Sequence, residues 1–336
     1  MAVNLKGRDF LKIKDFSTEE LQYLLDLSIK LKEDKLSGCE AQNLKGKNIV
    51  LLFQKDSTRT RCAFECGAHD QGAHVTYIGP SGSHMGTKES IADTARVLSR
   101  MFDGIEFRGF SQDDVEELAQ NSYVPVYNGL TDEWHPTQML ADYLTIQEEF
   151  GRNLKGRVFT YMGDGHNNMA HSYIVMGAKM GIEMRLGCPK EQWPEQEVID
   201  YANEVNKETG GKLIITEDPI EAAKDADIIT TDVWVSMGES KDLFKERIEL
   251  LKPYQVNDEL VKHCKEDYIF LHCLPAFHND ETATAKDVIE HVGFGKDGME
   301  VTDSVFESKH SRAFQEAENR LHTIKAVMVA TIGSQN

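Results

Sequence analysis

Residues 48–61 read NIVLLFQKDSTRTR, and this stretch decides the fold. After Asn48, residues 49–53 form an apolar run, so that 48–53 has strand length, and Ser57 then supplies a residue type that is preferred at a helix N-cap. A strand that leads through a short polar turn into a helix, here from Thr58 to about Gln71, is the opening of a βαβ unit. Strand His74 to Ile78 and a helix from Glu89 to Met101 follow. This alternation predicts a parallel sheet.

The pattern extends in both directions. Ser17 to Glu20 has the S-x-x-E form of a capping box, which predicts a first helix from about 18 to 33. A second series of strands and helices begins after Gly156, and its expected elements are strands 157–162, 183–188, 212–216, 227–232 and 269–273, with helices 169–180 and 196–209. The last helix, Ala313 to Ile332, is apolar all round, so we expect it to be buried and to return to the first domain.

The length of 336 residues favours two domains. We expect one over 1–150, joined by the C-terminal helix 315–333, and one over 151–314. The fold class that follows is α/β, with two doubly wound parallel-sheet domains and the active site in the cleft between them. Ligands of such sheets bind beyond the carboxyl ends of the strands, so residues that directly follow strands are the functional candidates.

Composition limits the possible partners. The formal net charge of −19 disfavours nucleic acid and anionic membrane surfaces, because both would be repelled. No apolar run reaches the roughly 20 residues that span a bilayer, and the N-terminal residues do not read as a signal sequence. The six cysteines show no CxxC pair, as expected of free thiols in a reducing compartment. We therefore expect a cytoplasmic protein.

Four segments carry candidate chemistry. Ser57 to Arg61 combines hydroxyls, helix N–H groups and arginines, which suits an anion, although an ordinary N-cap with solvated arginines has the same pattern. Arg59 and Arg61 are two residues apart on a helix, so only one should reach a ligand. Residues 135–138 (His-Pro-Thr-Gln) offer donors and an acceptor for a small planar group with C=O and NH₂, whereas the alternative is a structural histidine at a helix start.

The other two segments lie in the second half. Gly163 to Asn168 resembles part of a dinucleotide fingerprint, but the third glycine and the later acidic residue are missing, so Asn167 and Asn168 are better interpreted as ligands of an amino-acid carboxylate. The fourth segment is a pair, Asp232 to Glu239 and residues 272–275 (His-Cys-Leu-Pro). Asp232 is a natural counter-ion for an ammonium group. From spacing alone, Cys273 reads as a buried small hydrophobe, and Leu274-Pro275 is a candidate cis bond.

Taken together, these motifs resemble the transcarbamoylase family along essentially the whole chain. The Ser236-Met237-Gly238 loop combined with His-Cys-Leu-Pro is similar to the ornithine branch specifically. The resemblance implies transfer of the carbamoyl group of carbamoyl phosphate to the side-chain amine of L-ornithine, giving citrulline, in arginine biosynthesis or breakdown. It also implies a homotrimer or an assembly of trimers.

The resemblance assigns roles by position. Domain 1–150 would bind carbamoyl phosphate and domain 151–314 would bind ornithine. The carbamoyl phosphate ligands implied are Ser57, Thr58, Arg59, Thr60, His84, Arg108, His135, Pro136, Thr137, Gln138, Cys273, Leu274 and Arg320. Those for ornithine are Asn168, Asp232, Ser236 and Met237. Arg108, His135 and Cys273 would act in catalysis, with Arg108 bridging the phosphate and the carbonyl oxygen. His84 stands where members of this branch often carry glutamine, in a loop that reaches a neighbouring subunit.

The implied chemistry needs no metal and no redox cofactor. The side-chain amine has a solution pKa of about 10, and only its neutral form attacks a carbonyl carbon, so nearby arginines would both favour deprotonation and stabilise an oxyanion. Three alternatives stay open: a transferase for putrescine or another amine, a nucleotide-dependent oxidoreductase, and a non-catalytic protein that binds anionic metabolites. Putrescine lacks the α-carboxylate that Asn168 and Met237 would hold.

Overall fold

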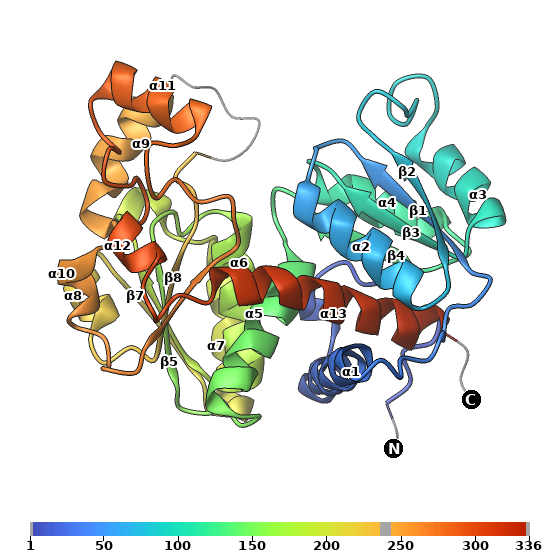
Figure 1. Ribbon diagram of the computed structural model, residues 1–336, viewed down its shortest axis with the longest axis horizontal. Helices are drawn as coiled ribbons and strands as arrows, with labels where there is room; N and C mark the ends of the chain where they lie inside the picture. The colour runs from blue at the N-terminus through green and yellow to red at the C-terminus, as the bar shows by residue number, and fades with distance from the viewer. Residues whose placement is uncertain (1–2, 236–242, 334–336) are drawn as a thin grey trace. The chain divides into compact units, whose positions relative to one another are not determined.

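The computed structural model describes residues 3–235 and 243–333. The chain divides into two compact units, Met1–Thr145 with Ala317–Asn336 and Ile146–Glu316 (Figure 1). Each unit is built on one parallel sheet, of four strands in the first unit and five in the second within the described residues. The predicted fold class of two doubly wound parallel-sheet α/β domains is confirmed. The expected placement of a site in a cleft between the domains stays a prediction.

The first unit has the strand order β2-β1-β3-β4. Its strands are β1 (Asn48–Phe53), β2 (His74–Ile78), β3 (Gly104–Arg108) and β4 (Val126–Leu130). Its helices are η1 (Ile13–Asp15), α1 (Thr18–Leu36), α2 (Thr58–Asp70), α3 (Ile91–Met101) and α4 (Gln112–Asn121), together with most of α5 (Pro136–Phe150) and of α13 (Ala313–Ile332). One face of the sheet packs against α3 and α4 through a buried apolar cluster that includes Val50, Phe107, Ala95 and Leu118.

Local sequence signals explain where the helices begin. Ser17 caps α1 with a capping box, since its side chain accepts from Glu20 N–H while the Glu20 side chain accepts from Ser17 N–H. Ser57 caps α2 in the same position that the sequence indicates. Ser90 caps α3, so this helix begins at Ile91 and not at Glu89. Strands β1 and β2 have the predicted bounds.

Strand β3 was not predicted, and it is central to the first sheet. It pairs with β1 on one side and β4 on the other, and all five of its residues are buried. Glu106 and Arg108 alternate with the apolar Ile105 and Phe107, which join the cluster against α3 and α4. The two charged residues therefore point to the opposite face, where α2 and α13 pack. Strand β4, next to β3, begins at Val126 and includes Asn128 and Gly129.

The second unit has the strand order β7-β6-β5-β8-β9. Its strands are β5 (Val158–Met162), β6 (Glu183–Gly187), β7 (Lys212–Thr216), β8 (Ile228–Thr231) and β9 (Ile269–His272). Its helices are α6 (Asn168–Met180), η2 (Lys190–Gln192), α7 (Gln196–Thr209), α8 (Pro219–Ala223), α9 (Leu243–Leu251), η3 (Lys252–Tyr254), α10 (Asp258–Val261), α11 (Ala283–Val292) and α12 (Asp303–Phe306).

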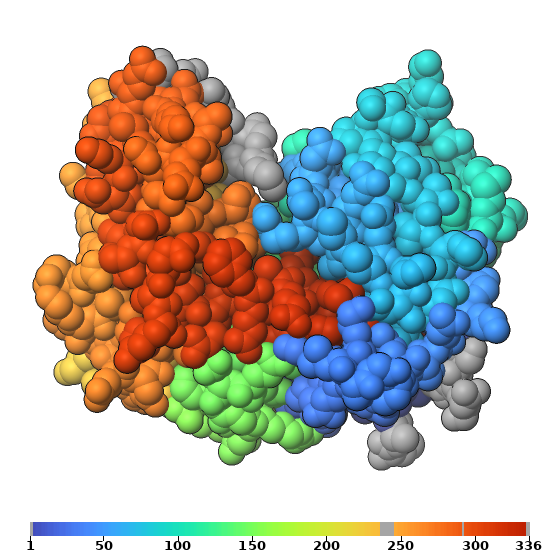
Figure 2. All heavy atoms as spheres, in the orientation of Figure 1, coloured from blue at the N-terminus to red at the C-terminus, as the bar shows by residue number. Residues whose placement is uncertain are grey.

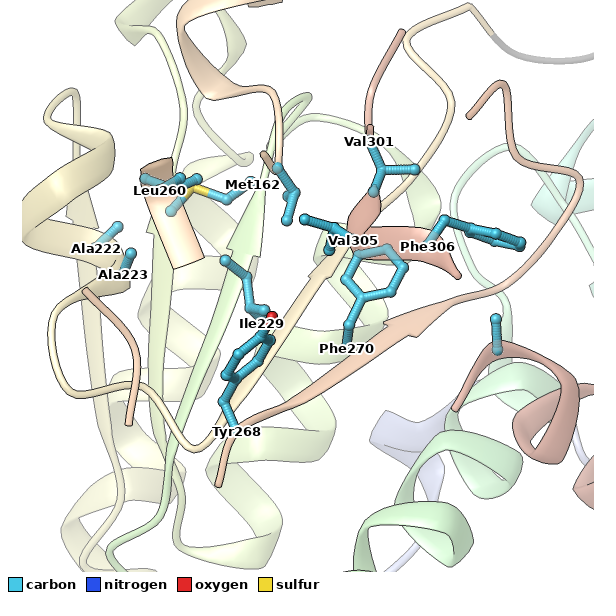
Figure 3. Close-up of a cluster of buried hydrophobic side chains, with 12 residues drawn as sticks. Met162, Ala222, Ala223, Ile229, Leu260, Tyr268, Phe270, Val301, Val305 and Phe306 are labelled. Atoms are coloured by element: carbon cyan, nitrogen blue, oxygen red, sulfur yellow. The ribbon is translucent and has the colours of Figure 1, made fainter. Parts of the chain in front are cut away.

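Both faces of the second sheet are covered. On one face Met162, Ile229 and Phe270 pack with side chains from α8, α10 and α12 (Figure 3). On the other face the ring of Tyr173 in α6 contacts Phe159, with ring centroids 5.0 Å apart, and Tyr161 at 5.9 Å. Strands β8 and β9 are buried at every position, as expected of parallel strands that are covered on both faces, whereas the edge strand β7 has no fully buried residue. Among the described helices, none combines the length and the apolar character that crossing a membrane requires.

Helix α13 has the predicted bounds, Ala313–Ile332, and most of its residues are buried. It carries a fully buried ammonium group at Lys325, which forms ion pairs with Glu40 and, at 2.8 Å, with Asp70. Burial raises the pKa of Asp70, but the hydrogen bonds from Lys325 and Lys35 outweigh burial, so the pKa of this carboxyl is lowered. This cluster joins α13 to α2 and to the segment that follows α1.

Replacing Lys325 by methionine should destabilise the first unit by about 3 to 5 kcal/mol, because two partly buried carboxylates would lose their shared cation. The measurement is the free energy of the first unfolding transition in urea, and Lys45→Met at an exposed lysine is the matched control. The variant should lose less stability than the parent between pH 6 and pH 3, since the Asp70 contribution is present above the unfolded-state pKa of about 3.9 and is lost below it. Equal stability of the two methionine variants would contradict this account.

Candidate active site

The strand order of the first sheet places β1 next to β3, so the chain leaves these two strands in opposite directions. Phe53 at the end of β1 is in register with Arg108 at the end of β3. Such a switch point opens a crevice at the carboxyl edge of the sheet, where ligands of doubly wound folds bind. Ser57 and Thr60 follow β1, and His135 follows β4, so the candidate residues gather at this edge.

Two buried arginines meet at Thr60. Arg108 Nη1 donates to Thr60 Oγ1 at 3.3 Å, and Arg320 Nη2 of α13 donates to the same oxygen at 2.8 Å. Arg108 is 3% exposed and Arg320 2%. Ser57 stands at the N-cap of α2, where its Oγ accepts from Thr60 N–H at 3.3 Å. Two buried guanidinium groups beside a helix N-terminus form a strongly anion-attracting site.

His135 lies within the field of these arginines. It is buried, and its Nδ1 is 3.4 Å from Thr137 Oγ1. Burial lowers the pKa of His135 well below its ordinary value, and the charges of Arg320, Arg108 and Arg59 lower this pKa further. The imidazole is therefore neutral at pH 7, and it can act as a hydrogen-bond donor without adding a fourth positive charge.

The two arginines of the Ser57 to Arg61 segment lie in different environments. Arg61 is exposed, its Nε donates to Glu65 at 2.9 Å, and its guanidinium lies 3.9 Å from the ring centroid of Tyr77. Arg59 is partly buried and acts electrostatically on His135. Only Arg59 therefore belongs to the basic site. Thr58, the first residue of α2, is exposed at the same helix terminus.

The helix after β4 contributes a second set of polar groups. Pro136 is the first residue of α5, and Thr137 Oγ1 donates to the Gly129 carbonyl at 3.5 Å. Gln138 is fully buried, and its Nε2 donates to Asp142 Oδ1 at 2.8 Å. This bond fixes the orientation of the Gln138 amide. These residues lie next to His135 in the chain and share its buried environment.

His84 is placed differently from the other candidates. It is exposed on the loop of residues 79–90, which projects from the first unit between β2 and α3 (blue-green in Figures 1 and 2). The carbonyl of His84 accepts from the N–H groups of Thr87, Lys88 and Glu89, so the loop has a defined local turn. Its expected contact with a neighbouring subunit stays a prediction.

The second sheet has its switch point between β5 and β8, where Met162 is in register with Thr231. Asp232 follows β8 directly, and Cys273 follows β9. The Cys273 thiol donates to Asp232 Oδ1 at 3.2 Å, and Val233 N–H donates to the same oxygen at 2.8 Å. Burial raises the pKa of Asp232, whereas the hydrogen bonds from Cys273 and Val233 act in the opposite direction. Cys273 is thus a partner of a carboxylate and not only an apolar core residue.

Two glutamates that the sequence interpretation missed hold the His272 motif. His272 Nδ1 accepts from Leu274 N–H at 3.0 Å, so Nε2 carries the proton and faces Glu300 Oε1 at 3.2 Å. His272 N–H donates to Glu316 at 2.9 Å. Both glutamates are fully buried. The two glutamates therefore hold the end of β9 that precedes Cys273. The Leu274-Pro275 peptide bond, a candidate cis bond from the sequence, is cis.

The loop after β5 supplies amide groups. Asn167 caps α6, where its Oδ1 accepts from Ala170 N–H at 2.9 Å, and its Nδ2 donates to Tyr161 at 2.9 Å. Asn168 is the first residue of that helix and is partly buried. The structure thus brings Asn168, Asp232 and Cys273 to one edge of the second sheet. Ser236 and Met237, the other residues predicted to bind ornithine, lie outside the described residues.

Within the described residues, one group of side chains has metal-ligand geometry, His278, Asp303 and Glu307. His278 Nδ1 is already 2.6 Å from Asp303 Oδ1, and the two carboxylates are exposed. This is the arrangement of an ordinary surface ion pair. The group includes none of the residues at the two switch points, so the proposed chemistry does not depend on it.

The fold and the two sets of side chains define a two-domain α/β protein with a cluster of buried arginines at the carboxyl edge of one sheet and a hydrogen-bonded Asp232–Cys273 pair at the carboxyl edge of the other. Two family models match the chain: aspartate/ornithine carbamoyltransferase, carbamoyl-P binding domain, at residues 8–148, and aspartate/ornithine carbamoyltransferase, Asp/Orn binding domain, at residues 155–331. The chain belongs to the aspartate/ornithine carbamoyltransferase family.

Individual relatives agree along their whole length. The chain is 56% identical to an ornithine carbamoyltransferase of Limosilactobacillus reuteri, with 100% of both chains covered. It is 59% identical to a catabolic ornithine carbamoyltransferase of Streptococcus gordonii, with 98% of this chain and 96% of the relative covered. The solved ornithine carbamoyltransferase of Pyrococcus furiosus superposes with a TM-score of 0.91 at 42% identity, with 100% of both chains covered.

Proposed function

We propose that this protein transfers the carbamoyl group of carbamoyl phosphate to the side-chain amine of L-ornithine, giving L-citrulline and phosphate in arginine metabolism. The observation that carries the proposal is the cluster of Arg108, Arg320 and Arg59 around the neutral His135. The relatives named as ornithine carbamoyltransferases support the same reaction, and their names include catabolic forms.

The first unit would hold carbamoyl phosphate. Ser57, Thr58 and Thr60, with the N–H groups at the start of α2, would bind the phosphoryl oxygens together with Arg59. Arg108 would bridge the phosphate and the carbonyl oxygen, and Arg320 would approach the same oxygen from α13. Because Arg108 and Arg320 already share Thr60 Oγ1, their guanidinium groups are held in place before a ligand arrives.

The carbamoyl group itself would be oriented by α5. His135 would donate to the carbonyl oxygen, since burial and three arginines keep it neutral at pH 7. Gln138 would meet the amino end, with Pro136 and Thr137 shaping the wall. The same arginines would then stabilise the negative charge that develops on the oxygen when the amine attacks, and phosphate would leave as the anion that the site was built to hold.

The second unit would hold ornithine. Asp232 would pair with the α-ammonium and Asn168 with the α-carboxylate, together with Ser236 and Met237, which are outside the described residues. The Cys273 thiol, which is hydrogen-bonded to Asp232, would lie beside the reacting amine. The Leu274 carbonyl would lie there as well. His84 would reach the carbamoyl phosphate of a neighbouring subunit. These assignments follow the family pattern, and the observed grouping of Asn168, Asp232 and Cys273 supports them.

The experiment compares ornithine, putrescine, lysine and aspartate as acceptors at pH about 8, with product release from carbamoyl phosphate as the measurement. We expect a preference for ornithine of at least about 10²-fold in kcat/KM, because a lost charge pair costs several kcal/mol. A preference for putrescine would keep the carbamoyl phosphate site but overturn the assignment of Asn168 and Asp232. Binding of carbamoyl phosphate without turnover of any amine would overturn the transferase.

Two further parts of the proposal concern the assembly and the cell. A homotrimer or a multiple of trimers follows from the family pattern, and light scattering coupled to gel filtration measures the mass directly. A cytoplasmic location is supported by the free cysteines, since Cys39, Cys62 and Cys66 are exposed thiols that suit a reducing compartment.

A further inference from the structure

Glu106 is a carboxyl group that the proposed reaction does not use, although it lies behind the basic site. It sits on β3 two residues before Arg108 and is fully buried. Neither of its carboxyl oxygens has a hydrogen-bond partner among the described residues. An ionised carboxylate in such a place is normally paired or hydrogen-bonded, so this arrangement calls for a specific explanation.

The position of Glu106 relative to the basic site follows from Gly129. A Cβ atom at position 129 would lie 1.9 Å from Glu106 Oε1 and 3.0 Å from Thr60 Cγ2. Any larger residue at 129 would therefore displace the carboxyl group, and the glycine leaves the space that Glu106 occupies. The carboxyl group is therefore close to Thr60, whose Oγ1 accepts the hydrogen bonds of both Arg108 and Arg320.

Three charged or titratable groups of the described residues interact electrostatically with Glu106. They are Arg108 on β3, Arg320 on α13 and Tyr77 on β2. Arg59 and His135 are not among the groups whose charges shift the pKa of Glu106, although all three arginines act on His135. Burial raises the pKa of Glu106 well above its ordinary value, while the charges of Arg108 and Arg320 lower it. The protonation state of this carboxyl therefore depends on how far the two positive charges are engaged elsewhere.

We propose that Glu106 is a positioning residue that takes up a proton when an anion binds beside Arg108 and Arg320. In the empty site, the carboxyl group offsets part of the repulsion between the buried arginines. When a phosphate-like anion takes over that role, an ionised Glu106 becomes a second buried negative charge that the arginines must share. Protonation removes that charge, and the two guanidinium groups are then held by the ligand.

The consequence is a linkage between anion affinity and pH. The bound anion raises the pKa of Glu106 above its value in the free protein, so affinity is highest below the free-state pKa. As pH rises from there to the bound-state pKa, the dissociation constant should increase by up to about tenfold per pH unit and then level off. This inference rests on the proposed function only in taking Arg108 and Arg320 as anion ligands.

The test measures binding of inorganic sulfate, whose own charge does not change between pH 6 and pH 9, by calorimetry in buffers of different ionisation enthalpy. The full-length protein should take up a fraction of a proton per sulfate, up to one, and its dissociation constant should rise with pH. Glu106→Gln keeps the shape of the side chain without its charge, so both the uptake and the pH dependence should disappear. Uptake that is unchanged in Glu106→Gln would overturn the proposal, and so would binding that is independent of pH in the parent.

His135→Gln separates the second titratable group of the site. It should retain the proton uptake, and Tyr77→Phe should retain it as well. If Glu106→Gln does not fold, the other two variants still test the proposal. Loss of all proton uptake in His135→Gln would show that the histidine, and not Glu106, takes up the proton. Citrulline formation by the parent is measured in the same preparation. Proton uptake without citrulline formation would refute the proposed reaction but leave the inference about Glu106 intact. Citrulline formation without linked proton uptake would refute the inference about Glu106 but leave the proposed reaction intact.

Discussion

Replacing Arg59 by alanine should lower kcat/KM for citrulline formation by about 10² to 10³-fold, which corresponds to roughly 3 to 4 kcal/mol of transition-state stabilisation. Arg59 is one of the three arginines whose charges act on His135. Its loss would remove a ligand of the transferring group and also let the pKa of His135 rise. The measurement is steady-state kinetics with carbamoyl phosphate varied at saturating ornithine.

The matched control is Arg61→Ala, two residues further along the same helix. Arg61 is exposed and paired with Glu65, so this variant should keep kcat/KM within about twofold of the parent, because exposed ion pairs contribute little. A comparable loss in both variants would mean that α2 is disturbed as a whole. Near-parent activity of Arg59→Ala would remove this arginine from the site.

Replacing Asp232 by asparagine should raise KM for ornithine by about 10²-fold, since truncating one partner of a desolvated charge pair costs roughly 3 kcal/mol. Asparagine keeps the size of the side chain but lacks the negative charge that would hold the ammonium group and that accepts the Cys273 thiol proton. Affinity for carbamoyl phosphate should not change, because the residues proposed to bind its phosphate lie on the other sheet. Kinetics with each substrate varied in turn separate the two effects.

Asp225→Asn is the control for this second variant. Asp225 is exposed near the amino end of the same strand, β8, and its φ of 55° is a conformation that asparagine adopts readily. We expect parent-like kinetics. If Asp232→Asn changed the affinity for carbamoyl phosphate and left KM for ornithine unaltered, the roles given to the two sheets would be wrong.

Much of the fold could be predicted because local signals and tertiary packing agree. The run from Ile49 to Phe53 is apolar at successive positions, and Ser57 follows it with a cap, so the first strand and the start of α2 were placed correctly. The capping box of Ser17 and Glu20 likewise allowed the start of α1 to be predicted. The Ala313–Ile332 helix was recognised because its apolar residues cover every face, as burial within a fold requires.

Strand β3 escaped prediction for a physical reason. Its sequence, Gly-Ile-Glu-Phe-Arg, places two charged residues in a strand that is buried on both faces. Glu106 and Arg108 both lie on the face that meets the proposed anion site, where the charge of each acts on the other. Residue preferences for β-strands describe ordinary strands, in which buried positions are apolar. A strand that carries charged residues toward a functional site does not follow these preferences.

The candidate site was predictable where its residues lie in short motifs. Ser57 to Arg61 and residues 135–138 and 272–275 each contain several functional groups within a few positions. Glu300 had no such signal, because it lies 28 residues from its partner His272 and reaches it only through the fold. For the same reason nothing near Arg320 in the sequence indicates that its guanidinium meets Thr60, 260 positions away.

The most direct test of the central claim follows the bond that forms. Carbamoyl phosphate labelled with ¹³C is mixed with L-ornithine labelled with ¹⁵N at its side-chain nitrogen, and the product is followed by ¹³C NMR against a protein-free control. We expect a ureido carbon signal that is split by the side-chain ¹⁵N, with one phosphate released per citrulline. An unsplit product signal, or phosphate released at the rate of the protein-free control, would contradict it.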